Sequence, residues 1–269
     1  MAVTDEDLVP VPNACRYDYA GSCWWCGALA DSREHKWKKS EVVKLFGKGS
    51  YGDSVLWVHE DGVESVRGPK AASLMFGPTL CGSCNSTRSQ SFDRAYEVFS
   101  NYVIDHHDNL LTVQLLDFED IFGEDTSNQL PKLARYYAKH IGCRIAERAG
   151  RVPDDIVQFL DQKIDNPSSV FSQLGIREAL RNLTNENDEP EFGLSLRNSV
   201  ADYSQAAGGS LNTFKSGVGV GAIEFIYDVN LDPSRSNIGN GIFSETTQVL
   251  WPHGEDLYNL QMYIPTNLD

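Results

Sequence analysis

The chain has 269 residues, of which 41% are hydrophobic and 23% are charged, and its formal net charge is −15. It is too long for a disulfide-stapled miniprotein, and its composition is typical of a globular chain with one large or two modest domains. No segment approaches the roughly 18 consecutive apolar residues of a membrane span, so we expect no membrane partner. The first residues, MAVTDEDLVPVPNAC, combine acidic side chains with no apolar run, which predicts a cytoplasmic protein.

Positive charge is concentrated in two segments of this acidic chain. Residues 33–94 contain ten Lys and Arg against seven Asp and Glu, and residues 132–151 contain six against one. A nucleic acid responds to the local field of one face more than to the net charge of the protein. These two segments are therefore where a phosphate backbone could bind.

Four of the six cysteines form two Cys-x-x-Cys pairs, Cys23 with Cys26 and Cys81 with Cys84. Four thiolates give zinc the tetrahedral shell that it prefers, and a closed shell leaves no open position for catalysis, so we predict a structural zinc site. The 54 residues between the pairs exceed the roughly 15–20 of a simple zinc ribbon, so a further structure is inserted there. Two cysteines lack partners at ligand spacing and are expected to be plain thiols, Cys15 and Cys143.

Three patterns predict the elements that follow. Asp61-Gly62 lies between β-forming residues in VLWVHEDGVESV, which predicts a short hairpin over 55–66. Apolar residues at positions 92, 95, 96, 99 and 103 predict an amphipathic helix over 85–104, directly after the second cysteine pair. Four-residue steps from Leu133 to Ile145 predict a second helix over 132–149, with a basic exposed side.

The last third of the chain is predicted to be mainly β, because GAIEFIYDV, TQVLW and LYNLQMYI are rich in β-forming residues. Thr184–Glu191 (TNENDEPE) is polar and acidic, as linkers are. We therefore expect an α+β chain of three parts: a zinc-bearing module over 15–110, a helical region over 111–184, and a β-rich C-terminal region over 185–269.

Three pieces of sequence in this order, CWWCG, REHKW and LCGSCNSTRSQSFDRAY, resemble the zinc-knuckle form of the HNH (His-Me finger) endonucleases over residues 20–105. The resemblance implies a zinc-stapled ββα module, in which a hairpin carries Glu34-His35 and the following helix carries the remaining ligand of a divalent ion. It implies that His35 is the general base that deprotonates water, and that Glu34 and Asn85 hold the catalytic ion. The four paired cysteines then match the ligands of a structural zinc ion.

The activity implied is metal-dependent hydrolysis of nucleic-acid phosphodiester bonds, with DNA preferred over RNA as the substrate. Hydrolysis of a phosphodiester bond needs residues of these types. The unperturbed pKa of histidine, about 6.5, suits a base that activates water near neutral pH. Mg²⁺ prefers oxygen ligands and takes only one or two carboxylates or carbonyls, which Glu34 and Asn85 could supply, and Mn²⁺ could replace it. A restriction enzyme or an effector of phage defence would fit this activity.

Several residues have a second interpretation. Asn85 directly before a helix could be its N-cap instead of a metal ligand. Arg88 either clamps the scissile phosphate or is a solvated helix residue, and Asp93 either orients a basic side chain or is an exposed carboxylate. Trp24 and Trp25 could stack on bases, but packing against the zinc site is favoured.

Other basic and metal-like residues could either have a binding role or be solvated surface residues. Four lysines near His35 either hold flanking phosphates or form a solvated face: Lys36, Lys38, Lys39 and Lys44. The cluster Asp105-His106-His107-Asp108 resembles a metal site, although charged residues at a helix end are usually solvated.

One part of the HNH pattern is missing. No Asn occurs from Lys36 through Cys84, so the middle Asn that usually positions the histidine is absent, and Ser73, Lys70 or His59 would have to replace it. The alternative is a non-catalytic zinc-binding interaction module derived from an HNH fold. Its acidic C-terminal region would then bind a protein partner or a second copy of the chain.

Overall fold

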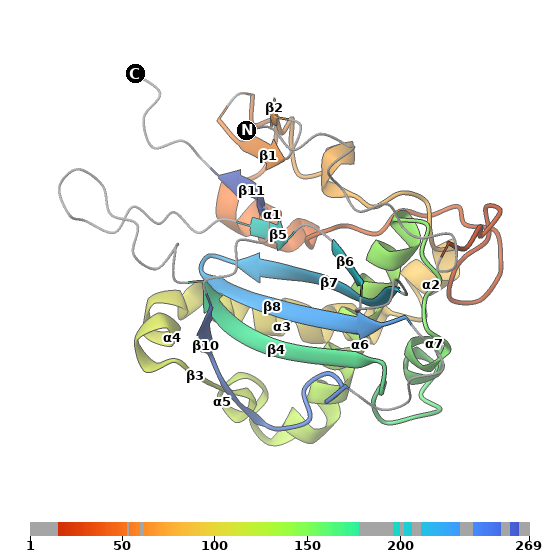
Figure 1. Ribbon diagram of the computed structural model, residues 1–269. Coiled ribbons are helices and arrows are strands. Elements are labelled where there is room, and N and C mark those ends of the chain that lie inside the picture. The colour runs from red at the N-terminus through yellow and green to blue at the C-terminus, as the bar shows by residue number, and fades with distance from the viewer. Residues whose placement is uncertain are drawn as a thin grey trace.

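The computed structural model describes residues 16–52, 54–59, 62–177, 196–199, 202–205, 211–231, 239–253 and 259–263. They form a mixed helix and strand structure (Figure 1). The helices are α1 (Lys39–Phe46), α2 (Gly82–Asn85), α3 (Gln90–Asp105), α4 (His107–Val113), α5 (Phe118–Phe122), α6 (Thr126–Glu147) and α7 (Asp154–Leu160), with short 3₁₀ turns at Ala72–Leu74 and Gly123–Asp125.

The strands are β1 (Leu56–His59), β2 (Gly62–Ser65), β3 (Leu115–Asp117), β4 (Val170–Arg177), β5 (Leu196–Ser199), β6 (Asp202–Gln205), β7 (Leu211–Val220), β8 (Ile223–Asn230), β9 (Thr247–Val249), β10 (Trp251–His253) and β11 (Asn259–Tyr263). One nine-stranded sheet has the order β10-β4-β8-β7-β5-β11-β1-β2, with β6 also paired to β7. Its pairings are antiparallel apart from that of β10 with β4. The strands β3 and β9 form a separate antiparallel pair.

Two long helices, α3 and α6, cover one face of this sheet. They lie behind β4 and β8 in the view of Figure 1. The Tyr96 ring on α3 stacks on Tyr136 of α6 with 3.7 Å between centroids, and Tyr137 of α6 stacks on Phe225 of β8 at 3.9 Å. Because these rings bury large apolar areas, they join the helices and the sheet into one core.

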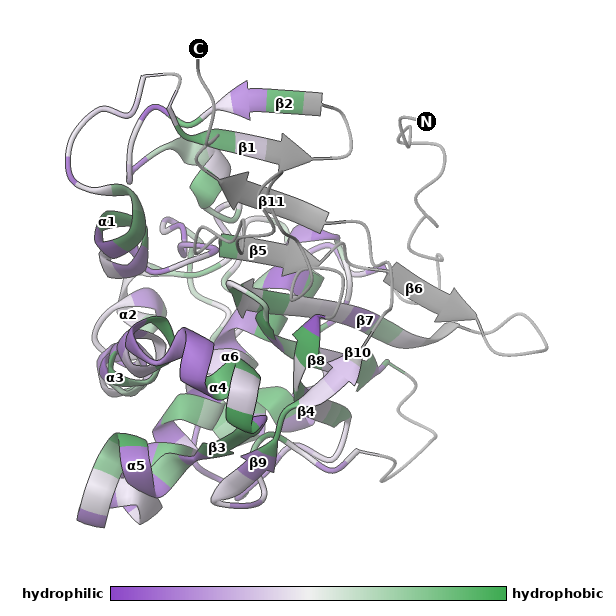
Figure 2. Cartoon of the chain, turned by 90° about the vertical axis from the view of Figure 1, so that its left-hand side faces the viewer, coloured by the Kyte–Doolittle hydropathy of each residue, from purple (hydrophilic) through white to green (hydrophobic). Residues whose placement is uncertain are grey.

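The hairpin predicted over 55–66 is confirmed by the pairing of β1 with β2, in which His59 faces Gly62, whereas Asp61 lies outside the described residues. The predicted C-terminal strands are also present as β8, β9, β10 and β11. In Figure 2, β2, β1, β11 and β5 lie one beside the next in that order. Strands from the first and the last part of the chain therefore share a sheet. The predicted linker Thr184–Glu191 falls outside the described residues.

The helix predicted over 85–104 is α3, and the five residues that set its apolar periodicity are all buried. It begins at Gln90 because the chain first forms the short turn of α2 around the second cysteine pair. The helix predicted over 132–149 is α6, which begins earlier, at Thr126. Its predicted basic exposed side is wrong for Lys139 and Arg144, which are buried. Lys139 faces carboxylates, and the guanidinium of Arg144 lies over the Phe76 ring.

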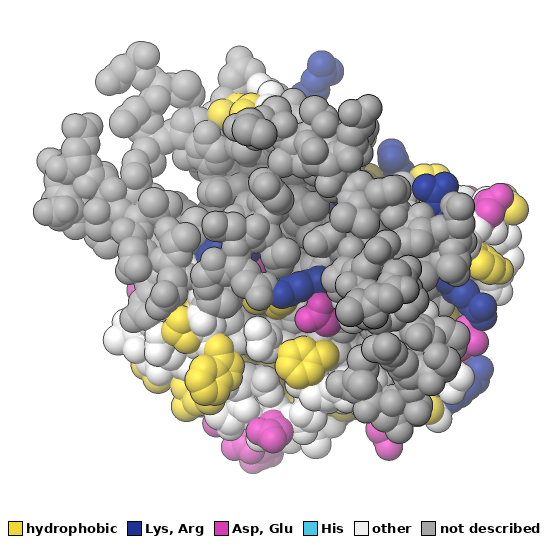
Figure 3. Space-filling model, in the orientation of Figure 1, with side chains coloured by type: hydrophobic (Ala, Val, Ile, Leu, Met, Phe, Trp, Pro, Cys, Tyr) yellow, Lys and Arg dark blue, Asp and Glu magenta, His cyan; other side chains and the backbone are white. Residues whose placement is uncertain are grey.

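None of the helices in the described ranges combines the length and the apolar character that a membrane crossing requires. Figure 3 shows apolar side chains, with uncharged and acidic ones around them, on the lower half of the face viewed in Figure 1, where β4 and β10 lie. Phe171 of β4 and Trp251 of β10 are 43% and 61% exposed. Single exposed apolar side chains are common on globular proteins, so they carry no functional conclusion.

Candidate metal centre and neighbouring ionic cluster

The two cysteine pairs meet in space. The Sγ atoms of Cys23, Cys26, Cys81 and Cys84 all lie within 4.8 Å of one another, and Cys26 and Cys81 are 3.6 Å apart. A tetrahedral zinc ion with bonds of about 2.3 Å would place its sulfur ligands about 3.8 Å apart. The geometry and the donor type therefore fit a structural metal ion such as zinc, and these four side chains are the ones that could hold it.

Each pair is shaped by local backbone. Gly27, with φ of +78°, follows the first pair and adopts a conformation that L side chains rarely take, so the chain can turn back over Cys23. Cys81 stands at the N-terminal end of α2, where its Sγ accepts a hydrogen bond from the backbone N–H of Cys84 at 3.4 Å. That N–H lowers the pKa of the Cys81 thiol, whereas burial raises the pKa of Cys84. A metal ion would bind the deprotonated sulfurs, so its binding would release protons from these thiols.

Arg88 supports the cysteine cluster. Its Nη1 donates to Cys84 Sγ at 3.3 Å, its Nη2 pairs with Asp161, and its guanidinium lies 4.4 Å from the centre of the Trp25 ring. The Trp25 indole N–H also donates to Asp161 at 2.8 Å. Trp24 and Trp25 are buried, as the packing interpretation predicted. In this arrangement Arg88 is held between the Cys84 sulfur and the Asp161 carboxylate.

Glu34 and His35 lie on an extended segment that pairs antiparallel with residues 74–80. Phe76 N–H donates to Glu34 C=O at 2.9 Å, Lys36 N–H donates to Leu74 C=O at 2.8 Å, and His35 faces Met75 across a β-bridge. The β1–β2 hairpin is a separate element between these two segments. After residue 80 the chain enters the second cysteine pair and then α3.

His35 is half-buried, and its Nδ1 is a buried atom with no hydrogen-bond partner in the described ranges. Burial lowers the pKa of His35; Glu34 opposes the shift, and Lys38 and Lys39 add to it. The imidazole is therefore mainly neutral at pH 7. Neither Ser73 nor Lys70 bonds to Nδ1, and the His59 side chain is outside what the structure describes.

Asn85 is the last residue of α2 and does not cap α3, whose N-cap position is Ser89. Its Nδ2 donates to Ser32 Oγ at 2.8 Å and to the Arg33 carbonyl at 3.1 Å. These bonds join α2 to the segment that carries His35. The Asn85 Oδ1 is buried and has no partner among the described residues.

Glu34 belongs to a buried ionic cluster of four residues, Glu34, Lys38, Asp93 and Lys139. Lys38 Nζ lies 3.1 Å from Glu34 Oε1 and 2.6 Å from Asp93 Oδ1. Lys139 Nζ lies 3.1 Å from Glu34 Oε2 and 2.8 Å from Asp93 Oδ1, and it also donates to Ser89 Oγ. The side chains of Lys139 and Glu34 are 0% and 5% exposed, and those of Lys38 and Asp93 are 16% and 24% exposed.

The ionic cluster is balanced, with two positive and two negative groups. Burial alone would lower the pKa of Lys139, but Glu34 and Asp93 raise it above its usual value, so the ammonium stays protonated. Burial would likewise raise the pKa of Asp93, but Lys139 and Lys38 keep it low. The oxygen donors of Glu34 and Asn85 suit Mg²⁺, yet each Glu34 oxygen already has an ammonium partner. A divalent ion would therefore bind Glu34 most favourably if one lysine moved away.

Lys139 is a site residue that was not predicted from the sequence; α6 brings it to Glu34 from 105 positions further along the chain. A signal was present, because Lys139 lies three residues after Tyr136 and four before Cys143, both of which face the core. Asp161 was not predicted either; it follows α7 and joins Trp25 to Arg88. No spacing in the sequence marks that contact.

The other lysines near His35 differ in their surroundings. Lys44 pairs with Asp105 at 2.7 Å, and the Lys36 ammonium lies 5.8 Å from the Trp57 ring and 5.9 Å from the Phe76 ring. Lys39 lines a separate surface depression. In the Asp105-His106-His107-Asp108 cluster, the His107 Nε2 accepts the Ala222 backbone N–H at 3.0 Å, which is a structural role.

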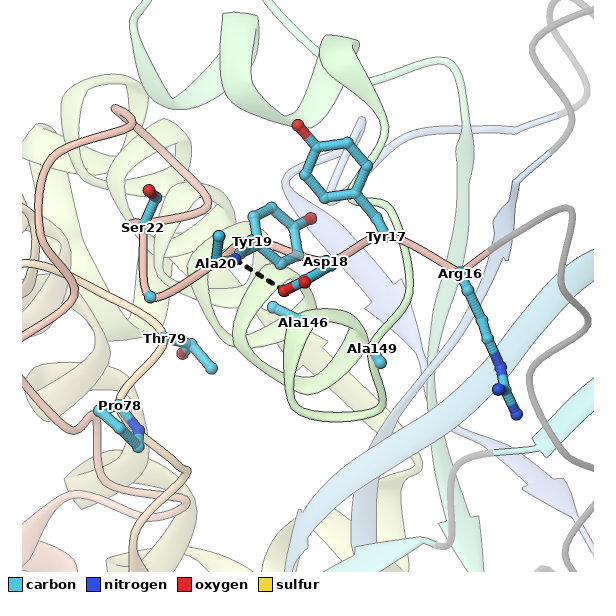
Figure 4. Close-up of a pocket in the computed structure, with 11 residues that line it drawn as sticks. Arg16, Tyr17, Asp18, Tyr19, Ala20, Ser22, Pro78, Thr79, Ala146 and Ala149 are labelled. Atoms are coloured by element: carbon cyan, nitrogen blue, oxygen red, sulfur yellow. Dashed lines mark hydrogen bonds between the residues drawn. The ribbon is translucent and has the colours of Figure 1, made fainter.

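A cavity of about 360 Å³ lies beside the segment that leads into the first cysteine pair (Figure 4). Residues 16–22 line it together with Pro78, Thr79, Ala146 and Ala149. The Tyr19 hydroxyl accepts a hydrogen bond from Val152 N–H and donates to the Gly150 carbonyl, and burial raises the pKa of Tyr19 to about 12. These bonds anchor the N-terminal segment to the end of α6.

Comparison with protein-family models, with curated proteins and with solved structures finds no significant match to this chain.

Proposed function

We propose that this protein is a metal-dependent endonuclease of the HNH type that hydrolyses nucleic-acid phosphodiester bonds, with DNA as the preferred substrate. The observation that carries the proposal is the pair of hydrogen bonds from Asn85 Nδ2 to Ser32 and Arg33. These bonds hold the end of α2 against the segment that carries Glu34 and His35. The four-cysteine cluster lies directly before Asn85 and could fix both pieces rigidly.

His35 has the properties of a general base. Its lowered pKa leaves the ring neutral near pH 7, so a ring nitrogen is free to take a proton from water. When bound, Mg²⁺ or Mn²⁺ would stabilise the charge that develops on the phosphate and on the leaving oxygen. The Asn85 Oδ1 is buried, has no partner among the described residues, and is a suitable ligand for such an ion. Glu34 follows Arg33, whose carbonyl Asn85 binds, and would supply the carboxylate.

The ionic cluster gives the two lysines different roles in this proposal. Lys139 is fully buried and holds Glu34 Oε2 in place throughout. Lys38 is more exposed and can leave Glu34 Oε1 to contact a substrate phosphate, because a flexible ammonium finds an equivalent partner in the phosphate oxygens. The oxygen that Lys38 leaves would then be available to the divalent ion.

Nicking of supercoiled plasmid in Mg²⁺ or Mn²⁺ tests the proposal, with wild type compared to His35→Ala after zinc content has been measured in both. Loss of the base should reduce the rate at least about 10²-fold. The control is His106→Ala, because His106 is exposed and contacts Tyr102 rather than the site. Cleavage that persists in His35→Ala, or that is absent from wild type in either metal, would contradict the assignment.

The second candidate is a non-catalytic zinc-binding interaction module. It is favoured by one observation: both oxygens of Glu34 are paired with lysines, so the ionic cluster is complete without a divalent ion. Metal binding discriminates the two. A nuclease should bind one tight zinc ion and a weaker, exchangeable Mn²⁺ that is lost in Asn85→Ala, whereas the interaction module should bind the zinc ion alone.

A further inference from the structure

A surface depression with four cations lies beside the His35 segment. It has a volume of about 670 Å³, and its basic lining residues are Lys39, Lys48, Arg67 and Lys70. All four side chains are exposed, and no carboxylate among the described residues lies within ion-pair distance of any of them. This lining contrasts with the net charge of −15 on the whole chain.

Helix α1 and two loops, at residues 48–49 and 67–71, form the depression, and the backbones of the loops fix its shape. A Cβ placed on Gly68 would lie 2.8 Å from the Gly49 carbonyl oxygen, so the two loops approach more closely than a side chain at 68 would allow. Gly49 itself has φ of +103°. The backbone N–H of Tyr51 also donates to the Arg67 carbonyl at 3.2 Å. The cations on the two loops are therefore presented from one defined surface.

The depression adjoins the proposed nuclease site through the chain itself. Lys39, on one wall, is four residues after His35, and Ala71, on the other, is four residues before Met75, which faces His35. Four residues of extended chain reach at most about 14 Å. Each DNA strand advances about 3.4 Å per nucleotide, so this distance corresponds to about four nucleotides or fewer. Lys39 is also close enough to affect the pKa of His35.

We propose that this depression binds the phosphate backbone of a nucleic-acid strand next to the point of cleavage. The inference rests on the proposed function for its substrate class and assigns the binding site that holds that substrate. Unpaired Lys and Arg side chains bind phosphates with the release of counterions and carry no base specificity. Val43, Pro69 and Ala71 also line the depression, and their apolar atoms suit contact with sugars.

Fluorescence anisotropy with a short labelled DNA duplex, in buffer without Mg²⁺ or Mn²⁺, tests this site separately from cleavage. The variant is K48A/R67A/K70A, and the control R94A/K132A/R151A removes three charges from residues outside the depression, on α3, on α6 and before α7. Zinc content and the thermal unfolding midpoint should be unchanged in both. Each lost phosphate contact should flatten the slope of log K against log salt by about 0.9, so wild type should lose about 40-fold more affinity than K48A/R67A/K70A between about 50 and 200 mM salt.

The results of this binding experiment distinguish an error in the proposed site from an error in the proposed function. Equal weakening in K48A/R67A/K70A and in the control would mean that only net charge matters, and it would overturn the site. The proposal would also be overturned by a wild type that binds no DNA. A mononucleotide or inorganic phosphate that binds wild type but not K48A/R67A/K70A, while the duplex binds both equally, would assign the depression to a small anion instead. Binding that depends on these residues without cleavage by wild type would keep the site and refute the nuclease.

Discussion

Lys139 Nζ lies 3.1 Å from Glu34 Oε2 in the interior of the protein, although 105 positions separate the two residues in the chain. The contact joins α6 to the extended segment that carries His35. Asp93 on α3 completes it from a third element, at 2.8 Å from the same ammonium. Three parts of the chain are thereby held around one buried charge beside the candidate site.

Lys139→Met should strongly destabilise the fold. The substitution keeps the length of the side chain but leaves Glu34 and Asp93 with a single cation, Lys38. An uncompensated buried charge costs about 3–5 kcal/mol, which urea unfolding can measure. The double variant E34Q/K139M restores neutrality and should be more stable than Lys139→Met alone. Equal stability of the single variant and wild type would show that the contact contributes nothing.

Cys84→Ser should abolish tight metal binding, because it removes one of the four sulfur donors that lie within 4.8 Å of one another. The thermal unfolding midpoint should fall with it. Cys143→Ala is the control, since Cys143 is buried in α6 outside the cluster. Metal analysis of the purified proteins should find one zinc ion per chain in wild type and Cys143→Ala. Retention of zinc by Cys84→Ser would contradict the site.

Arg88→Lys should weaken zinc binding without preventing it. A lysine cannot donate to Cys84 Sγ and pair with Asp161 while lying flat on Trp25, as the guanidinium does. Loss of such an outer partner typically costs 10- to 100-fold in metal affinity, so a chelator should remove zinc correspondingly more readily. Arg94→Lys, at an exposed position on the helix that follows, α3, should behave as wild type.

Because of His140, the protein should be less stable in mild acid than at neutral pH. It is fully buried, its Nε2 donates to the Lys36 carbonyl at 3.1 Å, and burial lowers its pKa well below 6.5. Below about pH 6.5, His140 is protonated in the unfolded chain but stays neutral in the folded chain. The free energy of unfolding should therefore fall by up to about 1.4 kcal/mol for each unit by which the pH is lowered. Urea unfolding between pH 7 and 5 should show a smaller dependence in His140→Gln. His106→Gln should leave it unchanged.

Because of Glu41, the protein should become less stable as the pH rises. Its carboxyl is fully buried, accepts a hydrogen bond from Tyr96, and has a pKa raised by burial to about 7. The folded state holds this proton between pH 4.5 and 7 more tightly than the unfolded chain does, so its contribution is lost as the pH rises through 7, by up to about 3 kcal/mol. Glu41→Gln should therefore gain stability relative to wild type between pH 6 and 9. Glu97→Gln, on the exposed side of α3, should not.

Regular elements could be predicted where one face of a segment meets one partner. The apolar period of residues 92–103 predicted α3, and the β-forming residues around Asp61-Gly62 predicted the β1–β2 hairpin. The basic side of α6 could not be predicted, because this helix is covered on several sides. A lysine at position 139 is predicted to be solvated, because the sequence does not show that the carboxylates of Glu34 and Asp93 lie beside it in the structure.

The sequence alone shows which residues could supply four sulfur donors, because two Cys-x-x-Cys pairs are a local pattern that is typical of zinc sites. It also determined the residue types of the candidate site, Glu34, His35 and Asn85. The surroundings of these residues depend on how the chain packs. The lysine pairing of Glu34, the attachment of Arg88 to Asp161 and the basic depression all depend on distances between segments far apart in the chain. Such distances follow from the packing of helices and sheet, which no local pattern records.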